Sequence, residues 1–229
     1  MLNLHGYGPS ILQGTLLTLE FCLVSLVIAM VLGMITAFAK LSGSRVLNFI
    51  AQAYTTLIRG VPDLVLMLII FFGGQILVNP MAAKVGYEDY IDIDPFIAGV
   101  STIGFIFGSY MAETFRGAIL AVPQGQLEAA RAYGMSPAQV FRRVLFPQMV
   151  RHAIPGFGNN WLVLMKATAL VSVIGLNDMV RMAGMAAGAT RQPFTFYLVV
   201  AVNYLILTSI SIWILDRVNK KYSTGIARE

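Results

Sequence analysis

Five apolar stretches, each long enough to cross a lipid bilayer, constrain the fold of this chain more than any other feature. They cover residues 11–38, 54–78, 96–121, 155–175 and 195–215. About 20 helical residues, rising 1.5 Å each, cross the roughly 30 Å of hydrocarbon in a bilayer. In lipid every backbone polar group must be paired within the protein, so each stretch forms a helix or a strand of a closed barrel. The apolar runs are continuous rather than alternating, which favours helices.

Composition agrees with this interpretation. Charged residues make up 12% of the 229 residues, whereas a soluble domain carries about 25%. The predicted fold class is therefore an all-α integral membrane protein with five transmembrane helices, and residues 1–229 are expected to form a single domain.

The distribution of basic residues predicts the orientation of the five helices. Eleven of the 16 Lys and Arg residues fall in three alternate segments: Lys40, Arg45, Arg59, Arg131, Arg142, Arg143, Arg151, Arg217, Lys220, Lys221 and Arg228. Cytoplasmic loops carry an excess of basic residues, so the N-terminus is expected outside and the C-terminus in the cytoplasm. The net charge of +5 is then explained by topology, and nucleic-acid binding is excluded.

The cytoplasmic segment at about 122–150 is polar and has the signals of two short helices. Glu128 to Tyr133 is rich in alanine and ends at Gly134, which suits a left-handed C-cap. Ser136 can cap a second helix and Gln139 can complete a capping box, and Pro147 is expected to end that helix. Such a knob can dock onto a soluble partner, or it can lie on the membrane as an amphipathic hairpin. Arg142 and Arg143 can pair with acidic groups of a partner or with anionic lipid headgroups.

Ionisable residues inside the predicted spans are candidates for a functional role, because charges in hydrocarbon usually face a cavity or a partner. Asp63 follows Arg59 by four residues, and Glu113 precedes Arg116 by three, so both acids can form a local ion pair. Alternatively, Asp63 and Glu113 give a transport pathway a negative lining. Lys166 either meets a substrate carboxylate or bonds to a neighbouring helix.

Catalytic and metal-binding residues are not expected. His5 and His152 are predicted near opposite faces of the membrane, and no Ser/His/Asp set or cluster with metal-ligand spacing stands out. No cofactor is predicted. The phosphate-binding pattern G-x-x-x-x-G-K-[ST] does not occur in the chain, so any energy from ATP has to come from a separate subunit.

The cytoplasmic segment also resembles a known signature. Glu128-Ala129-Ala130, then Gly134, then a helix followed by Pro147 is similar to the EAA loop of ABC importer permeases, in which this loop docks into the ATPase. The chain departs from the signature in reading Val144-Leu145-Phe146-Pro147 at its end. The resemblance implies ATPase coupling by Glu128, Ala129, Ala130, Gly134, Arg142 and Arg143.

The resemblance extends along nearly the whole chain. The segments Gly14-Thr15-Leu16, Arg59-Gly60-Val61-Pro62, Tyr110 to Gly117, Gly125-Gln126 and Lys166 to Leu170 occur in the order seen in polar amino acid permeases. Val61 to Leu66 and Ile91 to Pro95 look like the histidine and arginine/ornithine branch. Family members commonly carry leucine at the position of Asp63 and serine at that of Ala169. The candidate substrate pathway comprises Asp63, Tyr110, Glu113, Asn160, Lys166 and Thr168.

This family implies a transport subunit in the bacterial inner membrane that imports basic amino acids (arginine, ornithine, histidine or lysine). Its implied partners are an ABC ATPase homodimer, a second permease subunit that is a paralogue, an extracytoplasmic binding protein and membrane lipid. The alternative is a channel or a gradient-driven secondary transporter, which has no use for a docking loop.

Overall fold

A computed structural model describes residues 4–87 and 89–223, so Glu88 of the acidic segment 86–95 and Arg228 lie outside the described residues. The described part is helical throughout and contains no strand. Its elements are α1 (Gly8–Leu41), α2 (Arg45–Gly60), α3 (Asp63–Lys84), α4 (Pro95–Leu120), α5 (Gln124–Ala132), α6 (Pro137–Val140), the π-helical turn η1 (Phe141–Leu145), α7 (Phe146–Ala167), the 3₁₀ helix η2 (Thr168–Ile174), α8 (Met179–Thr190) and α9 (Pro193–Ser223).

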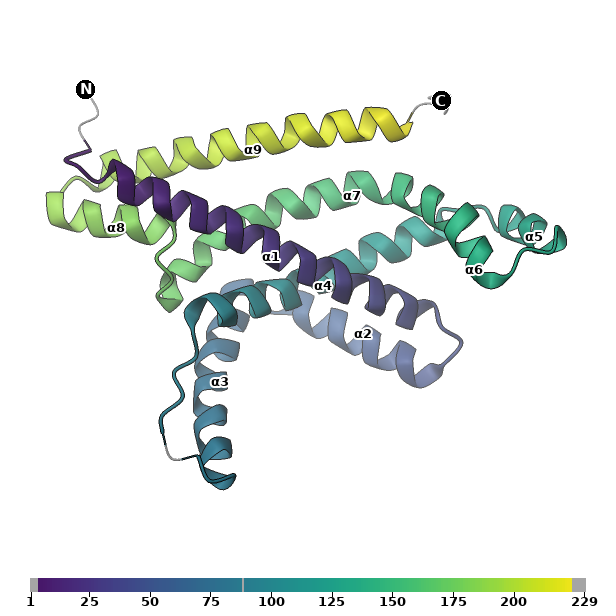
Figure 1. The fold of residues 1–229 in the computed structure, drawn as a ribbon, viewed down its shortest axis with the longest axis horizontal. Helices are drawn as coiled ribbons and strands as arrows, with labels where there is room; N and C mark the ends of the chain where they lie inside the picture. Colours follow the sequence, from purple (N-terminus) through teal and green to yellow (C-terminus); the bar gives the residue numbers. More distant parts are fainter. Residues whose placement is uncertain (1–3, 88, 224–229) are drawn as a thin grey trace.

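Five helical segments of the described residues are long and apolar enough to cross a membrane, which confirms the predicted number. They are Gly8–Leu41, Asp63–Lys84, Pro95–Leu120, Pro137–Ile174 and Pro193–Tyr222. α1, α4, α7 and α9 run along the long axis of the molecule, with α8 at one end and α5 and α6 at the other (Figure 1). We call the end that carries α5 and α6 the loop end; the charge distribution assigns it to the cytoplasm.

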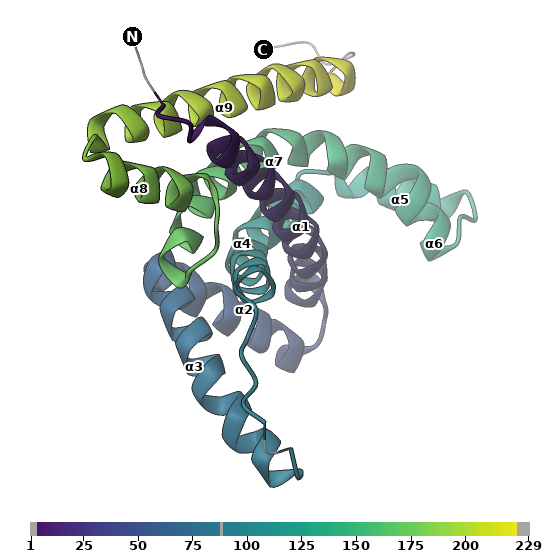
Figure 2. The same ribbon diagram turned by 60° about the vertical axis from the view of Figure 1, so that its left-hand side comes forward.

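The predicted start of the second span is wrong. Residues 54–78 do not form one helix, because the chain breaks at Val61 and Pro62 between α2 and α3. Proline disfavours helical backbone in the residue before it, and Val61 is extended, with φ −117° and ψ 140°. α2 is a separate amphipathic helix that buries Ala51, Thr55 and Ile58. α3 then extends away from the other spans in both views (Figures 1 and 2).

This break also relocates Arg59. Arg59 lies in the last turn of α2 rather than at the cytoplasmic end of a span, where the topology predicts it. α2 begins on the side of the loop end and runs back toward the middle of the molecule (Figure 1), so Arg59 lies about 20 Å along the helix from the start of α2 at 1.5 Å per residue. The other ten basic residues still support the predicted orientation.

The centre of the fold is a close contact between α1 and α4. Phe21, Ala29, Ile103, Ile106 and Met111 are fully buried in it. Glycines set the separation of the two helices: a Cβ atom on Gly33 would lie 2.5 Å from Cβ of Met111 and 3.1 Å from the backbone N of Ala112. A Cβ atom on Gly104 would lie 2.7 Å from Cβ of Ile28. Small residues give this close approach in membranes, where association rests on packing rather than on the hydrophobic effect.

A second cluster joins α8, α9 and the start of α1, with Ile11, Met179 and Phe196 at its centre. α8 begins with Asp178, whose carboxylate accepts hydrogen bonds from the backbone N–H groups of Arg181 (3.0 Å) and Val180 (3.3 Å). Burial raises the pKa of Asp178 to about 6, against the lowering effect of these hydrogen bonds. The backbone N–H of Met179 donates to Oγ1 of Thr18, which ties α8 to α1.

We expect Gly33→Ala to destabilise the protein by about 1–3 kcal/mol, the usual cost of overpacking, because the new methyl group meets the α4 backbone. Gly117→Ala is the matched control, since Gly117 also lies in a membrane helix but has no atom within 4 Å of an added Cβ. Gly117→Ala should leave the stability of the protein unchanged or raise it by up to about 1 kcal/mol, because alanine has the higher helix propensity. Thermal unfolding midpoints in detergent test the pair, and equal shifts for both would contradict the close α1–α4 contact.

Candidate functional site

The first helix of the predicted docking loop ends as expected. α5 stops at Ala132, and Gly134 has φ +78°. The backbone N–H of Gly134 donates to the carbonyl of Arg131 (2.9 Å), and that of Met135 donates to the carbonyl of Ala130 (3.2 Å). Glycine adopts this left-handed conformation without the steric cost that a Cβ atom brings. The prediction of a left-handed turn at Gly134 is confirmed.

The second helix begins with the predicted capping box. Oγ of Ser136 accepts a hydrogen bond from the backbone N–H of Gln139 (3.4 Å), and Oε1 of Gln139 accepts one from the backbone N–H of Ser136 (2.9 Å). Pro137 occupies the first helical position, where its missing N–H is tolerated. Two short helices thus meet at a fixed turn.

The expected end of that helix at Pro147 is wrong. After α6 the chain makes the π-helical turn η1, in which the backbone N–H of Phe146 donates to the carbonyl of Phe141, and then continues as α7 to Ala167. Pro147 lies in the first turn of α7. The wider turn offers a place for a residue without an N–H group, so the helix is not interrupted. The helix that carries the fourth span therefore begins at Pro137 rather than at residue 155.

The loop exposes one surface and is anchored by another. Glu128, Ala129 and Gly134 are exposed, as are Arg142 and Arg143, whereas Ala130 and Val140 are buried between the helices. Phe141 of η1 packs edge-on against Phe38 of α1, with ring centroids 5.9 Å apart. The loop is therefore a rigid projection in contact with the end of α1. Sequence reasoning missed the Phe38 contact, which joins residues about 100 positions apart.

Two of the candidate pathway residues lie together where α2, α3 and α4 meet. The guanidinium of Arg59 lies over the ring of Tyr110, 5.4 Å from its centroid. Asp63, half-buried at the start of α3, also lies close enough to Tyr110 to interact electrostatically. Among the described residues, Arg59 and Asp63 form no ion pair within 4.0 Å, so the predicted local pair is not formed. We call Arg59, Asp63 and Tyr110 the junction cluster.

Glu113 has a different environment. One carboxylate oxygen accepts a hydrogen bond from Nζ of Lys40 (2.5 Å), and the other accepts one from Nε of Arg116 (2.9 Å). The Lys40 side chain is 4% exposed and also donates to Gln52 (2.9 Å) and Thr55 (2.5 Å) of α2. The predicted Glu113–Arg116 pair is confirmed. Sequence reasoning missed Lys40, although its helical spacing from the buried Gly33 and Ala37 was a signal that it faces the interior.

The remaining pathway candidates lie on α7 and η2. Nδ2 of Asn160 donates to Oγ1 of Thr114 on α4 (2.9 Å), one turn from Tyr110. Thr168 is buried, donates to the carbonyl of Met165 (2.7 Å) and lies 3.3 Å from the hydroxyl of Tyr204. Lys166 is exposed. The structure thus brings Asn160 near the junction cluster and holds Thr168 in a contact between η2 and α9.

Comparisons with known proteins agree with this architecture. Residues 29–224 match the family described as binding-protein-dependent transport system inner membrane component. The histidine/lysine/arginine/ornithine transport system permease protein HisQ of Salmonella typhimurium is 51% identical over 225 residues, which cover 98% of each chain. The arginine ABC transporter permease protein ArtQ of Escherichia coli K12 is 35% identical over 89% of this chain and 90% of its own.

Solved structures show the same fold. A chain from the crystal structure of an amino acid ABC transporter with histidines aligns with a TM-score of 0.79 and 32% identity, over 94% of this chain and 95% of that chain. A chain of the MetNI methionine ABC transporter in an inward-facing conformation aligns with a TM-score of 0.73 at 20% identity, over 93% and 96% of the two chains. The chain therefore belongs to the family of inner-membrane components of binding-protein-dependent transport systems.

Proposed function

We propose that this chain is a permease subunit of an ATP-driven ABC importer that takes up basic amino acids delivered by an extracytoplasmic binding protein. The observation that carries the proposal is the exposed two-helix loop at Glu128–Arg143, a rigid projection beyond the membrane helices. The names of relatives such as HisQ and ArtQ support arginine, ornithine, histidine or lysine as the substrate class.

The loop is the proposed contact for an ABC ATPase, present as a homodimer. Glu128, Ala129, Arg142 and Arg143 form its exposed surface, so charged groups are available for a partner. Motion of the ATPase would reach α1 through the contact between Phe141 and Phe38 and would reach α7 directly through η1, since the helix is continuous there. A channel or a gradient-driven transporter has no need of such a projection.

The junction cluster is the proposed site of charge selection in the pathway. Asp63 is half-buried and is not paired with a cation within 4.0 Å among the described residues, so its negative charge is available to a cationic side chain. Tyr110 and Asn160 offer polar groups nearby, and the exposed Lys166 offers a positive charge for a carboxylate. Glu113, held by Lys40 and Arg116, is assigned a structural role instead.

A second permease, a paralogue of this chain, is the proposed partner within the membrane. α3 buries only Met67 among its described residues and exposes an apolar surface that includes Ile69, Phe72 and Ile76. Two chains together would enclose a pathway that five spans of one chain do not.

The test is affinity purification from native membranes in mild detergent, followed by uptake measurements in proteoliposomes with ATP inside. Recovery of an ATPase and a second permease in near-equal amounts, with arginine uptake that stops without ATP, is the expected result. Uptake driven by an ion gradient in the absence of ATP would overturn the proposal in favour of a secondary transporter.

Removing the negative charge of the junction cluster should change selectivity. We expect Asp63→Asn to lower arginine uptake about tenfold, equivalent to about 1.4 kcal/mol, and to leave any uptake of neutral amino acids unchanged. Asp216→Asn, which removes an acid from α9, is the matched control and should not change the ratio of arginine uptake to neutral amino acid uptake. Competition assays with radiolabelled amino acids measure this ratio. An equal loss for both substrate classes would rule out charge selection by Asp63.

The left-handed turn in the docking loop should be essential for coupling. Gly134→Val forces a β-branched residue to φ +78°, a strain of about 1–3 kcal/mol, and should lower ATP-driven uptake at least about tenfold at unchanged membrane levels. Gly43→Val, at a loop position of the same end with open space around its Cβ and no positive φ, is the control. Normal coupling in the Gly134 variant, measured as uptake per ATP hydrolysed, would remove the docking assignment.

Breaking the Lys40–Glu113 pair should be more damaging than removing it whole. We expect Lys40→Met to cost about 3–5 kcal/mol of stability, because Glu113 loses its buried cation. The double variant Lys40→Met/Glu113→Gln should regain much of this loss, since the carboxylate that Lys40 neutralised is also removed and the remaining cation, Arg116, is 39% exposed to solvent. Thermal unfolding in detergent of the unmodified protein, Lys40→Met, Glu113→Gln and the double variant gives the coupling energy, and additive losses would show that the pair is not an energetic unit.

A further inference from the structure

An apolar cavity of about 500 Å³ lies between α1, α4, α7 and α9 at the loop end of the molecule. Its walls include Met30 of α1, Phe115 of α4, and Met149 and Ala153 of α7. Tyr222 of α9 supplies the one polar side chain among the described residues that line it. A polar amino acid would find neither a charge nor a second side-chain hydrogen-bond partner there, so this cavity is not part of the proposed transport pathway.

The length of the cavity matches one leaflet of the bilayer. Its lining runs from Phe146 to Phe157 on α7 and from Ile214 to Tyr222 on α9, which is about 17 and 12 Å at 1.5 Å per residue. The hydrocarbon core is about 30 Å thick, so each leaflet contributes about half. Phe146 begins α7 and Tyr222 ends the fifth span, which places the mouth of the cavity at the cytoplasmic interface.

The cavity is long for its volume. About 500 Å³ is spread over that length between helices on both sides. An extended hydrocarbon chain is narrow enough to enter. The occupant that fits the dimensions, the apolar walls and the position is an acyl chain.

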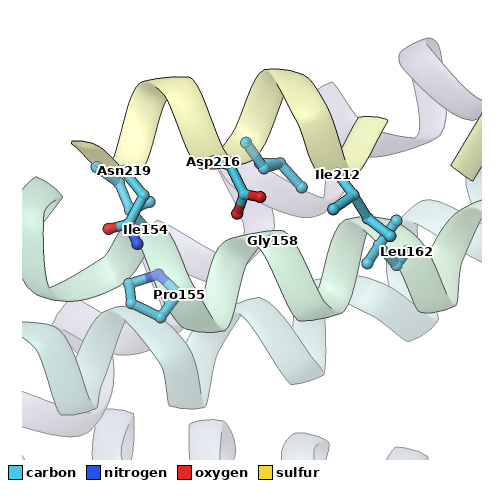
Figure 3. A pocket seen from close by; sticks show the side chains of 8 residues that line it. Ile154, Pro155, Gly158, Leu162, Ile212, Asp216 and Asn219 are labelled. Atoms are coloured by element: carbon cyan, nitrogen blue, oxygen red, sulfur yellow. The ribbon is translucent and has the colours of Figure 1, made fainter. Parts of the chain in front are cut away.

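Two basic residues lie at the mouth. Lys220 and Lys221 directly precede Tyr222, and both are exposed. Such juxtamembrane basic clusters attract anionic headgroups. On the adjacent side of the α7–α9 contact, a smaller pocket that shares Ile154 and Leu215 with the cavity holds Asp216 and Asn219 (Figure 3). The carboxylate of Asp216 would repel an anionic lipid, so the smaller pocket is unsuited to the ligand that the apolar cavity fits.

We propose that this cavity is a binding site for an anionic phospholipid of the cytoplasmic leaflet, with one acyl chain between α1, α4, α7 and α9 and its phosphate on the basic residues at the mouth. The bound chain fills the space that separates α9 from α1 and α4, so the lipid becomes part of the packing at the end where the docking loop is carried.

A site-specific crosslink identifies the occupant. A diazirine amino acid replaces Met149 inside the cavity or, as control, Val31 on the exposed surface of α1. The full chain is irradiated in native membranes or after a detergent wash, and its mass is measured. After the wash, an adduct of phosphatidylglycerol mass should persist at Met149 and disappear at Val31. Two outcomes would overturn the proposal: a crosslink from position 149 to another polypeptide, or loss of the lipid adduct at position 149 in the same wash that removes the adduct at position 31.

Two variant pairs test fit and charge separately. Ala153→Phe fills the cavity and should reduce the retained phosphatidylglycerol about tenfold, since its ring displaces several methylene groups, whereas Val27→Phe on the exposed surface of α1 should not. Lys220→Gln/Lys221→Gln should keep the acyl adduct but abolish the preference for phosphatidylglycerol over phosphatidylethanolamine. Equal retention in the two Phe variants, or no headgroup preference in the unmodified protein, would contradict the proposed site.

Discussion

The close contact between α1 and α4 is the constraint on which the rest of this structure depends. In a bilayer the surroundings are as apolar as the side chains, so helices associate through packing and hydrogen bonds rather than by leaving water. Gly33 and Gly104 let the two backbones approach to a distance that a Cβ atom would prevent. Elements that contact this pair, including α2, α7 and α8, take their positions from it.

The same contact explains the buried ion pair. Lys40 is the last buried residue of α1 and Glu113 lies on α4, so the two charges meet only because the helices are already held together. Lys40 also bonds to Gln52 and Thr55, which fixes α2 against the pair. A carboxylate neutralised on both oxygens has little capacity left to attract a substrate cation. Asp63, at the break between α2 and α3, retains that capacity, and the charge selectivity of the proposed pathway rests on it.

The loop end combines three features that would act together. The α5–α6 projection offers a surface for a soluble partner, η1 joins it without interruption to α7, and the apolar cavity lies directly beside the first half of α7. A helix that transmits motion needs stable packing along its length. An acyl chain in the cavity would supply that packing where the protein itself leaves space, which connects the proposed lipid site to the proposed transport function.

The sequence alone determined the features that depend on local chemistry. Hydropathy identified five membrane helices, since an apolar run of about 20 residues has few alternatives in lipid, and Gly134, Ser136 and Gln139 predicted the loop turn because caps and turns form within a few residues. The Glu113–Arg116 pair was predictable for the same reason. Pro147 was misjudged, because the effect of a proline depends on the backbone around it: Pro62 separates α2 from α3, whereas Pro147 is accommodated after a π-helical turn. Only the tertiary structure decided that Lys40 reaches Glu113 across 73 positions, that Arg59 and Asp63 meet Tyr110, and that a cavity remains beside α9. These depend on how helices far apart in the sequence pack, which no local pattern encodes.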